Sequence, residues 1–459
     1  HARILEAMEQ LYPDRAGQVV ERLAHQAFRG ESWETALTYS RQACTKAALR
    51  SAYRDAVASF EQALAALRHL PETTETLTTA FDLRLELRPW LVPLAAYERI
   101  FDNLQQAEGV ATALNDRRRL GLVHTYMTDY LRLTGRSQEA VARGRLALSF
   151  AEEVEDTPLL LLATVVAGHA CHAVGDYRRA VGLLRDNVSR ITGDLVRQRF
   201  GSAALPAVLS RSYMIFSLAD LGEFDEAVRI GQEAIQLAEQ SDTAHSQVLA
   251  THSLGLAYLI QGNLERAIPV IEQTYRHCQE ARIPLGARLL ASALGYAYLQ
   301  AGRVEESIPL LEESLRQAET LKVYFRYALW RAWLGEAYLA HGQTERAREM
   351  AERAAEHARR HGEVGHEAQA LWLSAEVARR GRPARPESAE TDYQQARELA
   401  DRLGMRPLHA HCRLGLARLY GALGDAARAR HESTAAAEEF GALAMTSWVE
   451  RAGQTLAVS

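Results

Sequence analysis

Histidine and cysteine side chains that could bind a metal lie close together at residues 169–172, which read His-Ala-Cys-His. Two residues three apart share one face of a helix, so His169 and His172 would lie side by side. A zinc site needs at least three protein ligands, and no third ligand is placed by spacing. The groups at residues 409–412 and at His361 with His366 are weaker candidates, and HExxH does not occur. We therefore expect no metal site.

Motifs for other chemistry do not occur either. The chain has no GxxxxGK[ST] loop, no GxGxxG after a strand and no GxSxG elbow, so neither a phosphate cradle nor an activated serine is indicated. We expect no catalytic residue and no cofactor, and predict that this chain is not an enzyme. One alternative of another class is a hydrolase or phosphatase that uses a groove acid or histidine, such as His169 or Glu336.

Composition describes a folded protein of ordinary polarity. The 459 residues are 47% hydrophobic and 24% charged, with a net charge of −5, and no run of 18 uncharged apolar residues occurs. No membrane span and no general attraction to nucleic acid are expected. Opposite charges alternate at residues 345–353, which favours a solvated face with ion pairs over an RNA surface. The four cysteines are far apart, which favours reduced, buried thiols and a cytoplasmic location.

The elements that must position the candidate residues are indicated by a repeat. The pattern Leu-Gly-x-x-Tyr, followed by Gly and then by Ala or Ser, begins at Leu254 and recurs at Leu294 and Leu334 with a constant spacing. A fixed step of about 40 residues is typical of stacked helix pairs. The sequence therefore predicts an open helical array in place of a closed globular domain.

A glycine expected at the end of the first helix of each pair shows the same repeat along more of the chain. Glycine is expected there because it readily adopts the left-handed conformation of such a turn. These glycines are Gly135, Gly175, Gly222, Gly262, Gly302, Gly342, Gly381 and Gly424. Five residues later a small side chain should let the second helix pack against the first: Ala140, Ala180, Ala227, Ala267, Ser307, Ala347 and Ala429. The same close approach is predicted at Gly168, Gly255, Gly295 and Gly335.

Three regions follow from the strength of this pattern. Residues 1–120 are expected to form divergent helical pairs, with Ala36, Ala56 and Ile100 at the small position. Residues 121–380 should form the regular repeats, with an insertion at residues 191–205. Residues 381–459, which begin with a proline-rich loop, should form the last helical pairs and a cap.

The spacing Leu-Gly-x-x-Tyr-x-x-x-Gly-x-x-x-x-Ala resembles the tetratricopeptide repeat in a variety of about 40 residues. The match is specific at residues 255–267, 295–307 and 335–347 and partial elsewhere, since Cys171 and Leu218 replace the tyrosine. The resemblance implies an all-α, right-handed superhelical solenoid of antiparallel helix pairs. It also implies a scaffold that binds a protein or peptide.

At a larger scale, the opening residues 4–25 look like the junction after the ATPase module in bacterial multidomain regulators. These regulators join a nucleotide cyclase or another output domain to an AAA/STAND-type ATPase and a tetratricopeptide array. Residues 175–180, 205–211 and 403–408 strengthen the likeness. It implies that this chain is the sensor or interaction arm of a longer signalling polypeptide, with the ATPase or cyclase upstream. Self-assembly into a homo-oligomer is the alternative within the binding class.

In such arrays the first helices line the concave groove. By register this places Asp129, His169, Phe216, Leu256, Tyr296, Glu336 and Arg418 there, and one turn along His172, Tyr213 and Trp333. We predict a peptide-binding groove made of His169, His172, Tyr213, Phe216, Tyr296 and Trp333. An equal alternative is that these aromatic side chains pack between helices. Replacing Phe216 and Tyr296 by alanine separates the two, because binding is lost in one case and the fold in the other.

Overall fold

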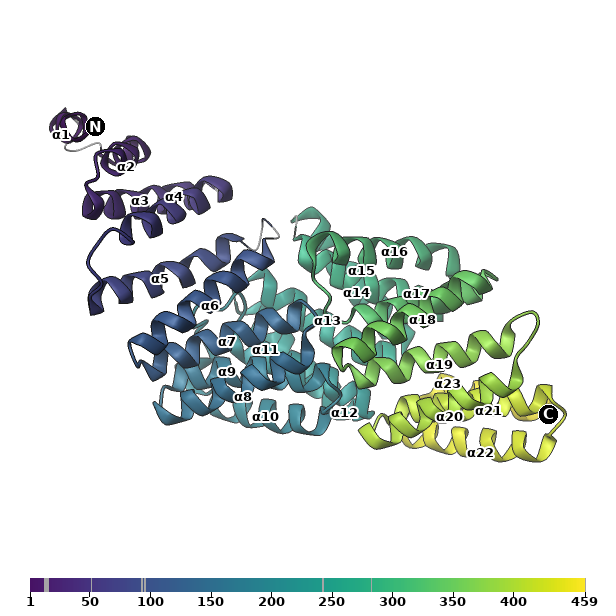
Figure 1. Ribbon diagram of the computed structural model, residues 1–459. Coiled ribbons are helices and arrows are strands. Elements are labelled where there is room, and N and C mark those ends of the chain that lie inside the picture. Colours follow the sequence, from purple (N-terminus) through teal and green to yellow (C-terminus); the bar gives the residue numbers. More distant parts are fainter. Residues whose placement is uncertain are drawn as a thin grey trace. The chain divides into compact units, whose positions relative to one another are not determined.

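The computed structural model of the protein describes residues 1–11, 16–50, 52–91, 94, 96–241, 243–281 and 283–458. In these ranges it contains 23 α-helices and two short 3-10 helices, and no strand (Figure 1). None of the helices in the described ranges is long and apolar enough to cross a lipid bilayer. Residues 12–15, part of the resemblance to the ATPase junction, lie outside the described residues.

The chain divides into two units. Unit 1 comprises residues 1–130 and 149–155, and unit 2 comprises residues 131–148 and 156–459. Unit 1 contains the beginning of α7 and the end of α8. Its elements are α1 (Ala2–Leu11), η1 (Ala16–Gln18), α2 (Val20–Arg29), α3 (Trp33–Leu49), α4 (Tyr53–Leu67), α5 (Thr74–Leu91), α6 (Tyr97–Ala113), α7 (Arg117–Leu133) and α8 (Ser137–Glu153).

Unit 2 continues the antiparallel helix pairs (Figure 1). The predicted insertion at residues 191–205 contains only a short 3-10 helix between α10 and α11. The elements are α9 (Thr157–Ala173), α10 (Tyr177–Arg190), η2 (Gly193–Arg197), α11 (Pro206–Leu221), α12 (Phe224–Glu239), α13 (Ala244–Gln261), α14 (Leu264–Glu280), α15 (Pro284–Gln300), α16 (Val304–Leu321), α17 (Tyr327–Ala340), α18 (Thr344–His361), α19 (Val364–Arg380), α20 (Pro386–Leu403), α21 (Arg406–Ala422), α22 (Ala426–Ala442) and α23 (Thr446–Val458).

The turn glycines explain where the first helices end. Seven of the eight predicted glycines have a positive φ, between 78° and 87°, so the left-handed turn is confirmed at these positions. Gly381 is the exception, with φ −66° and ψ 163°. The prediction of a left-handed turn at Gly381 is wrong. The proline-rich loop starts there, and Gly381 has an extended conformation directly after the end of α19.

Small residues bring the two helices of each pair together, as predicted. All seven predicted small residues that follow the turns are fully buried, from Ala140 to Ala429. A Cβ atom added to Gly295 would lie 2.8 Å from Leu311 of the paired helix α16, and one added to Gly255 would lie 2.6 Å from Ile271 of α14. Contacts under 3.0 Å leave no room for a side chain, so these positions set the spacing within the pair.

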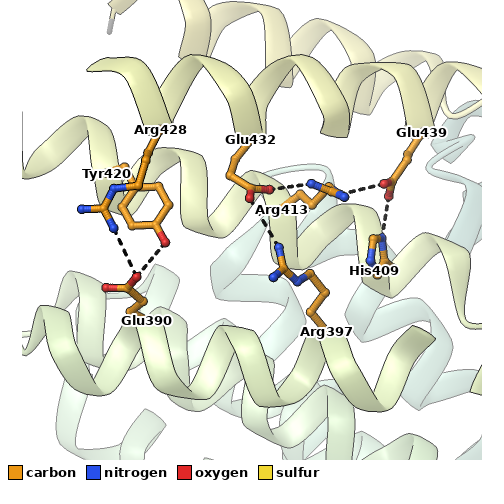
Figure 2. A network of polar contacts seen from close by, with 8 residues as sticks. All are labelled: Glu390, Arg397, His409, Arg413, Tyr420, Arg428, Glu432 and Glu439. Carbon is orange, nitrogen blue, oxygen red and sulfur yellow. Dashed lines mark hydrogen bonds and ion pairs between the residues drawn. The ribbon is translucent and has the colours of Figure 1, made fainter. Parts of the chain in front are cut away.

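At three repeats a tyrosine joins a helix pair to the pair before it. Tyr338 donates a hydrogen bond to Glu312 of the preceding second helix, and the guanidinium of Arg346 lies 3.9 Å from the centre of its ring. A ring held between a carboxylate and a cation is stabilised at both its hydroxyl and its face. The same arrangement joins Tyr298 to Glu272 and Arg303, and Tyr420 to Glu390 and Arg428 (Figure 2).

Charged residues of α21 and α22 form a network of ion pairs. Figure 2 shows Arg413 between Glu432 and Glu439, at 2.9 and 2.7 Å, with His409 2.8 Å from Glu439. In the alternating segment at residues 345–353, Arg348 pairs with Glu345. The expected ion-paired face is therefore present at this segment.

Distant repeats of unit 2 also contact one another. Arg406 donates a hydrogen bond to the backbone carbonyl of Leu221 and pairs with Glu223, while Ser447 donates to the carbonyl of Gly262. The residues joined by each of these two backbone contacts are 185 positions apart, which spans more than four successive helix pairs. In unit 2, helix pairs therefore also contact pairs that are not their neighbours in the chain. Successive small rotations bring later units back onto earlier ones.

Candidate functional site

A cavity of about 230 Å³, open to solvent, lies in unit 2 where the first helices face one another. Residues of α11, α13, α15, α17, α19 and α21 line it, together with α23. The lining mixes ring side chains with charged ones. The rings are Tyr296, Trp333, Trp372, His411 and Trp448, and the charged residues are Asp220, Arg326, Glu336, Glu376, Arg380 and Arg451. Concave sites with apolar walls and a few placed polar groups are the usual form of ligand pockets.

Helix α17 gives the cavity its length. Arg326, Leu329, Trp333, Glu336 and Ala340 all line the cavity and recur at steps of three or four residues along one face. A rise of about 1.5 Å per residue places the first and last of them about 20 Å apart. The lining face is therefore elongated, and an extended chain of about six residues has the same length.

A stacked aromatic pair forms one wall. The rings of Tyr296 and Trp333 are nearly parallel, at 6°, with centroids 4.4 Å apart. Burial, and then the charge of Glu336, raises the pKa of the Tyr296 hydroxyl. The phenol therefore stays protonated and available as a donor beside the Glu336 carboxyl group.

Glu336 is the unusual acid of the cavity. Burial raises its pKa to about 8, and the charge of Glu376 acts in the same direction, whereas the hydrogen bond with Tyr296 and the charge of Arg380 lower it. Glu376 differs because its carboxylate accepts hydrogen bonds from Arg379 and Tyr393. Burial raises the pKa of Glu376, but these partners lower it below its usual range. The two neighbouring acids thus hold different protonation states near neutral pH.

Arg326 is the buried cation of the cavity. It precedes α17 with a φ of 58°, a left-handed conformation that is uncommon for a residue with a side chain, and it is only 3% exposed. Its guanidinium lies 5.1 Å from the ring centre of Phe216. Burial raises the pKa of the nearby Asp220 to about 6, and the charge of Arg326 opposes this effect.

Two polar atoms in the lining have no hydrogen-bond partner among the residues that the structure describes. They are Nη1 of Arg326, a donor, and Oε1 of Gln369, an acceptor. A buried polar group without a partner costs about 1–3 kcal/mol, so such groups need an explanation. Both atoms belong to residues that face one cavity, which is where a ligand would satisfy them.

Comparisons with known proteins agree with this architecture. Residues 207–280 and 289–322 each match a model of the tetratricopeptide repeat. The fold is a tetratricopeptide-like solenoid. The search of curated proteins finds no match to the chain. Repeat arrays of this kind are protein-interaction scaffolds and are typically not catalytic.

Solved structures with the same kind of fold share little sequence with the chain. One is a Rap protein complexed with Competence and Sporulation Factor, with 15% identity and a TM-score of 0.57 over 80% of this chain and 98% of that one. Another is the Rap conjugation gene regulator of plasmid pLS20 in complex with the Phr* peptide, with 12% identity and a TM-score of 0.50 over 83% and 97%. A STAND protein with a tetratricopeptide repeat sensor from Pyrococcus horikoshii has 16% identity and a TM-score of 0.43 over 82% and 55%.

The tetratricopeptide-like array divides the six predicted groove residues into two groups. Tyr296 and Trp333 line the cavity, whereas His169, His172, Tyr213 and Phe216 do not. The second group packs behind the cavity, with the rings of His169 and Tyr213 3.6 Å apart.

The histidines of this second group are interior side chains. His172 is hydrogen bonded to Ser217 at 3.1 Å, while both ring nitrogens of His169 have no partner in the described part of the chain. Burial, and then the charges of nearby cations, lowers the pKa of both imidazoles well below the usual value. Both are therefore neutral at physiological pH, and their place here agrees with the alternative that these rings pack between helices.

Residues that the sequence did not place in the groove also line the cavity. Glu376 follows Glu336 by one repeat step of 40 residues and lines the cavity. The turn glycine of this repeat, Gly381, comes after only 39 residues and does not form the usual turn, so counting from it does not place Glu376 at the position of Glu336. Trp372 and His411 follow Trp333 at nearly the same step, a signal that was available. Trp448 belongs to α23, beyond the recognisable repeats, and nothing in the local sequence places it at the cavity.

Proposed function

We propose that the protein binds a short extended peptide, or an extended segment of a partner protein, in the cavity of unit 2. The observation that carries this proposal is the elongated lining along α17, about 20 Å long, with aromatic walls and two polar atoms without a partner. The Rap structures complexed with Competence and Sporulation Factor and with the Phr* peptide support it by analogy of fold.

The physical chemistry of the lining favours a peptide over a small apolar ligand. Stacked Tyr296 and Trp333 offer apolar area to side chains. Nη1 of Arg326 and Oε1 of Gln369 offer one donor and one acceptor, which match the carbonyl and amide groups of a peptide. Catalysis through His169 is less well supported, because its side chain is 1% exposed and a substrate cannot reach it.

Selection from a peptide library tests this proposal. Random heptapeptides should yield sequences that bind the whole protein, and Gln369→Trp should abolish binding, because Gln369 is half-buried and a large side chain there fills the cavity. Gln395→Trp is the matched control, because Gln395 is exposed on α20. Selected peptides that bind both variants as tightly as the wild type would contradict the assignment to the cavity.

A second part of the proposal concerns the role of this array in a larger signalling protein. We infer from the resemblance of the opening residues that this array acts as the sensor arm of a bacterial ATPase or cyclase regulator. Peptide binding would then change the rotations between units and so move the attached domain. Mass determination and sequencing of the native polypeptide test this directly, since a native chain without an ATPase or cyclase domain would rule it out.

A further inference from the structure

Helix α10 carries more positive charge than any other second helix of unit 2. It contains four arginines and one acid, whereas α12 contains one arginine and four acids, and α16 contains one arginine and five acids. Helix α18 has five arginines, but four glutamates stand among them. Since the whole chain has a net charge of −5, α10 is a basic helix in an acidic protein.

The charges of α10 lie together on its exposed face. Its buried residues recur at steps of three or four, for example Ala180, Leu184 and Asn187, and so occupy one side of the helix. Gly182 lies on the other side, where an added Cβ atom would meet nothing within 4 Å. This exposed side carries Asp186 and the four arginines, which are Arg178, Arg179, Arg185 and Arg190.

The insertion that follows α10 extends this basic surface. Val196 and Phe200 of the insertion pack against buried residues of α9 and α11, and so hold it in place. Arg197 and Arg199 lie between these two anchors in the sequence, and both are exposed. Residues 177–205 thus contain six arginines and two acids, a net charge of +4.

Most of these arginines have no counter-ion within the chain. Arg185 lies 3.0 Å from Glu226, but the other five form no ion pair with any residue that the structure describes. All five arginines of α18, by contrast, pair with a glutamate. Like charges on one helix face repel one another and lower stability. The unpaired arginines therefore need a reason other than the folding of this chain.

We propose that these arginines form a second binding surface, which binds an acidic segment of a partner protein. We call it the arginine face, and it consists of Arg178, Arg179, Arg185, Arg190, Arg197 and Arg199. Carboxylates of the partner would supply the missing counter-ions, since a guanidinium can donate two parallel hydrogen bonds to one carboxylate. None of these six residues lines the cavity, so this inference goes beyond the proposed function and does not depend on it.

The spacing along α10 suits a helical acidic segment. Arg178 and Arg185 are seven residues apart, about 10 Å along the helix, and acids seven residues apart on a partner helix have the same spacing. Gly182 lies between them and leaves room for a close approach of the partner. Glycine is less favourable than alanine in an exposed helix, and no contact within the chain accounts for it here.

A nucleic acid suits the arginine face less well. Asp186 stands among the arginines of α10, and Asp194 precedes those of the insertion. Closely spaced phosphates would meet these carboxylates, whereas a protein segment can place neutral or basic residues opposite them. The net charge of the whole chain also opposes the approach of a long polyanion.

A labelled synthetic peptide tests the proposal by fluorescence anisotropy with the whole protein. The probe is an alanine-based helical peptide of about 18 residues, with glutamates three or four positions apart on one face. It should bind at about 50 mM salt and lose affinity steeply toward about 300 mM, because salt screens exposed charges. The same peptide with lysine in place of every glutamate should not bind.

A triple variant locates the binding on the protein. Arg179→Gln combined with Arg190→Gln and Arg199→Gln should weaken binding of the glutamate peptide by about tenfold, as expected when three exposed ion pairs are lost. The thermal midpoint should not fall, because none of the three arginines has an ion pair to lose. Gly182→Gln fills the middle of the face and should weaken binding as well.

The matched control removes three arginines from α18. The combination of Arg353→Gln, Arg359→Gln and Arg360→Gln should bind the peptide as the wild type does, because these residues already have partners. Equal loss of binding in both triple variants would show an effect of net charge alone and overturn the proposal. So would equal binding to the wild type and to the α10 variant, or no binding at low salt.

Two further results would assign the arginine face to another occupant and overturn the proposal. One is single-stranded DNA of the same charge that binds more tightly than the glutamate peptide and loses this affinity in the α10 variant. The other is self-association of the wild type, measured by sedimentation, that the α10 variant abolishes. Heptapeptides selected for the cavity should bind the α10 variant unchanged, so failure here leaves the proposed function standing.

Discussion

Glu336 is expected to make the protein less stable as the pH rises above neutral. Its pKa is raised to about 8 by burial and by the charge of Glu376, against the hydrogen bond with Tyr296 and the charge of Arg380. The usual pKa of glutamate is about 4.3, so the native state binds this proton more tightly than the unfolded chain does. The stabilising effect is complete below about pH 4 and is lost as the pH rises through 8.

The size of this effect follows from the raised pKa. Each pKa unit corresponds to about 1.4 kcal/mol, so a native pKa of about 8 implies a loss of about 2 kcal/mol between pH 6.5 and 8.5. Asp220 has a pKa of about 6 and loses its proton below this range. The buried histidines have lowered pKa values, and their contributions cancel when a variant is compared with the wild type.

Urea unfolding followed by circular dichroism at the two pH values measures the effect. The wild type should lose about 2 kcal/mol more than Glu336→Gln, which keeps the shape of the side chain and removes its titration. Glu352→Gln, at an exposed position on α18, is the control and should behave as the wild type does. If the wild type and Glu336→Gln respond in parallel, Glu336 is ionised at neutral pH and the argument from its burial fails.

Further substitutions test the packing. Gly415→Ala should destabilise the protein by about 1–3 kcal/mol, because its Cβ would lie 2.3 Å from a buried tyrosine ring of α20, whereas Gly182→Ala in α10 meets open space and should stabilise by up to about 1 kcal/mol in urea melts. Phe216→Ala should cost about 3–5 kcal/mol and lower the thermal midpoint, since this side chain is fully buried; an unchanged midpoint would show it to be dispensable. Tyr338→Phe should cost about 0.5–1.5 kcal/mol, and a double-mutant cycle with Glu312→Gln should show coupling.

Features of the fold that depend on one helix pair could be predicted from the sequence. A left-handed turn needs glycine, and close helix packing needs a small side chain, so Gly262 and Ala267 identify a pair whatever surrounds it. The recurring tyrosine was visible too, but its partners were not. Glu312 lies well before Tyr338 in the chain and Arg346 lies after it, and only the packed structure shows that the three side chains meet.

Features that depend on the summed geometry of many units could not be predicted. The contact between Arg406 and Leu221 joins residues 185 positions apart, and it follows from small rotations added over several pairs. No single residue encodes that sum. The same addition decides the place of Phe216, for which the sequence left a groove position and packing between helices equally open, and this side chain is buried.

Arg326 shows why the candidate site departs from the rules that the repeats obey. Its backbone has a left-handed conformation without being glycine, its charge is buried, and one of its donors has no acceptor in the described residues. Each of these features lowers stability, and a sequence selected only for stacking would avoid all three at one position. Strain and unsatisfied polar groups persist where binding restores the lost interactions. A carbonyl group of a bound peptide would supply the missing acceptor at Arg326, so the proposed ligand would offset part of this loss of stability.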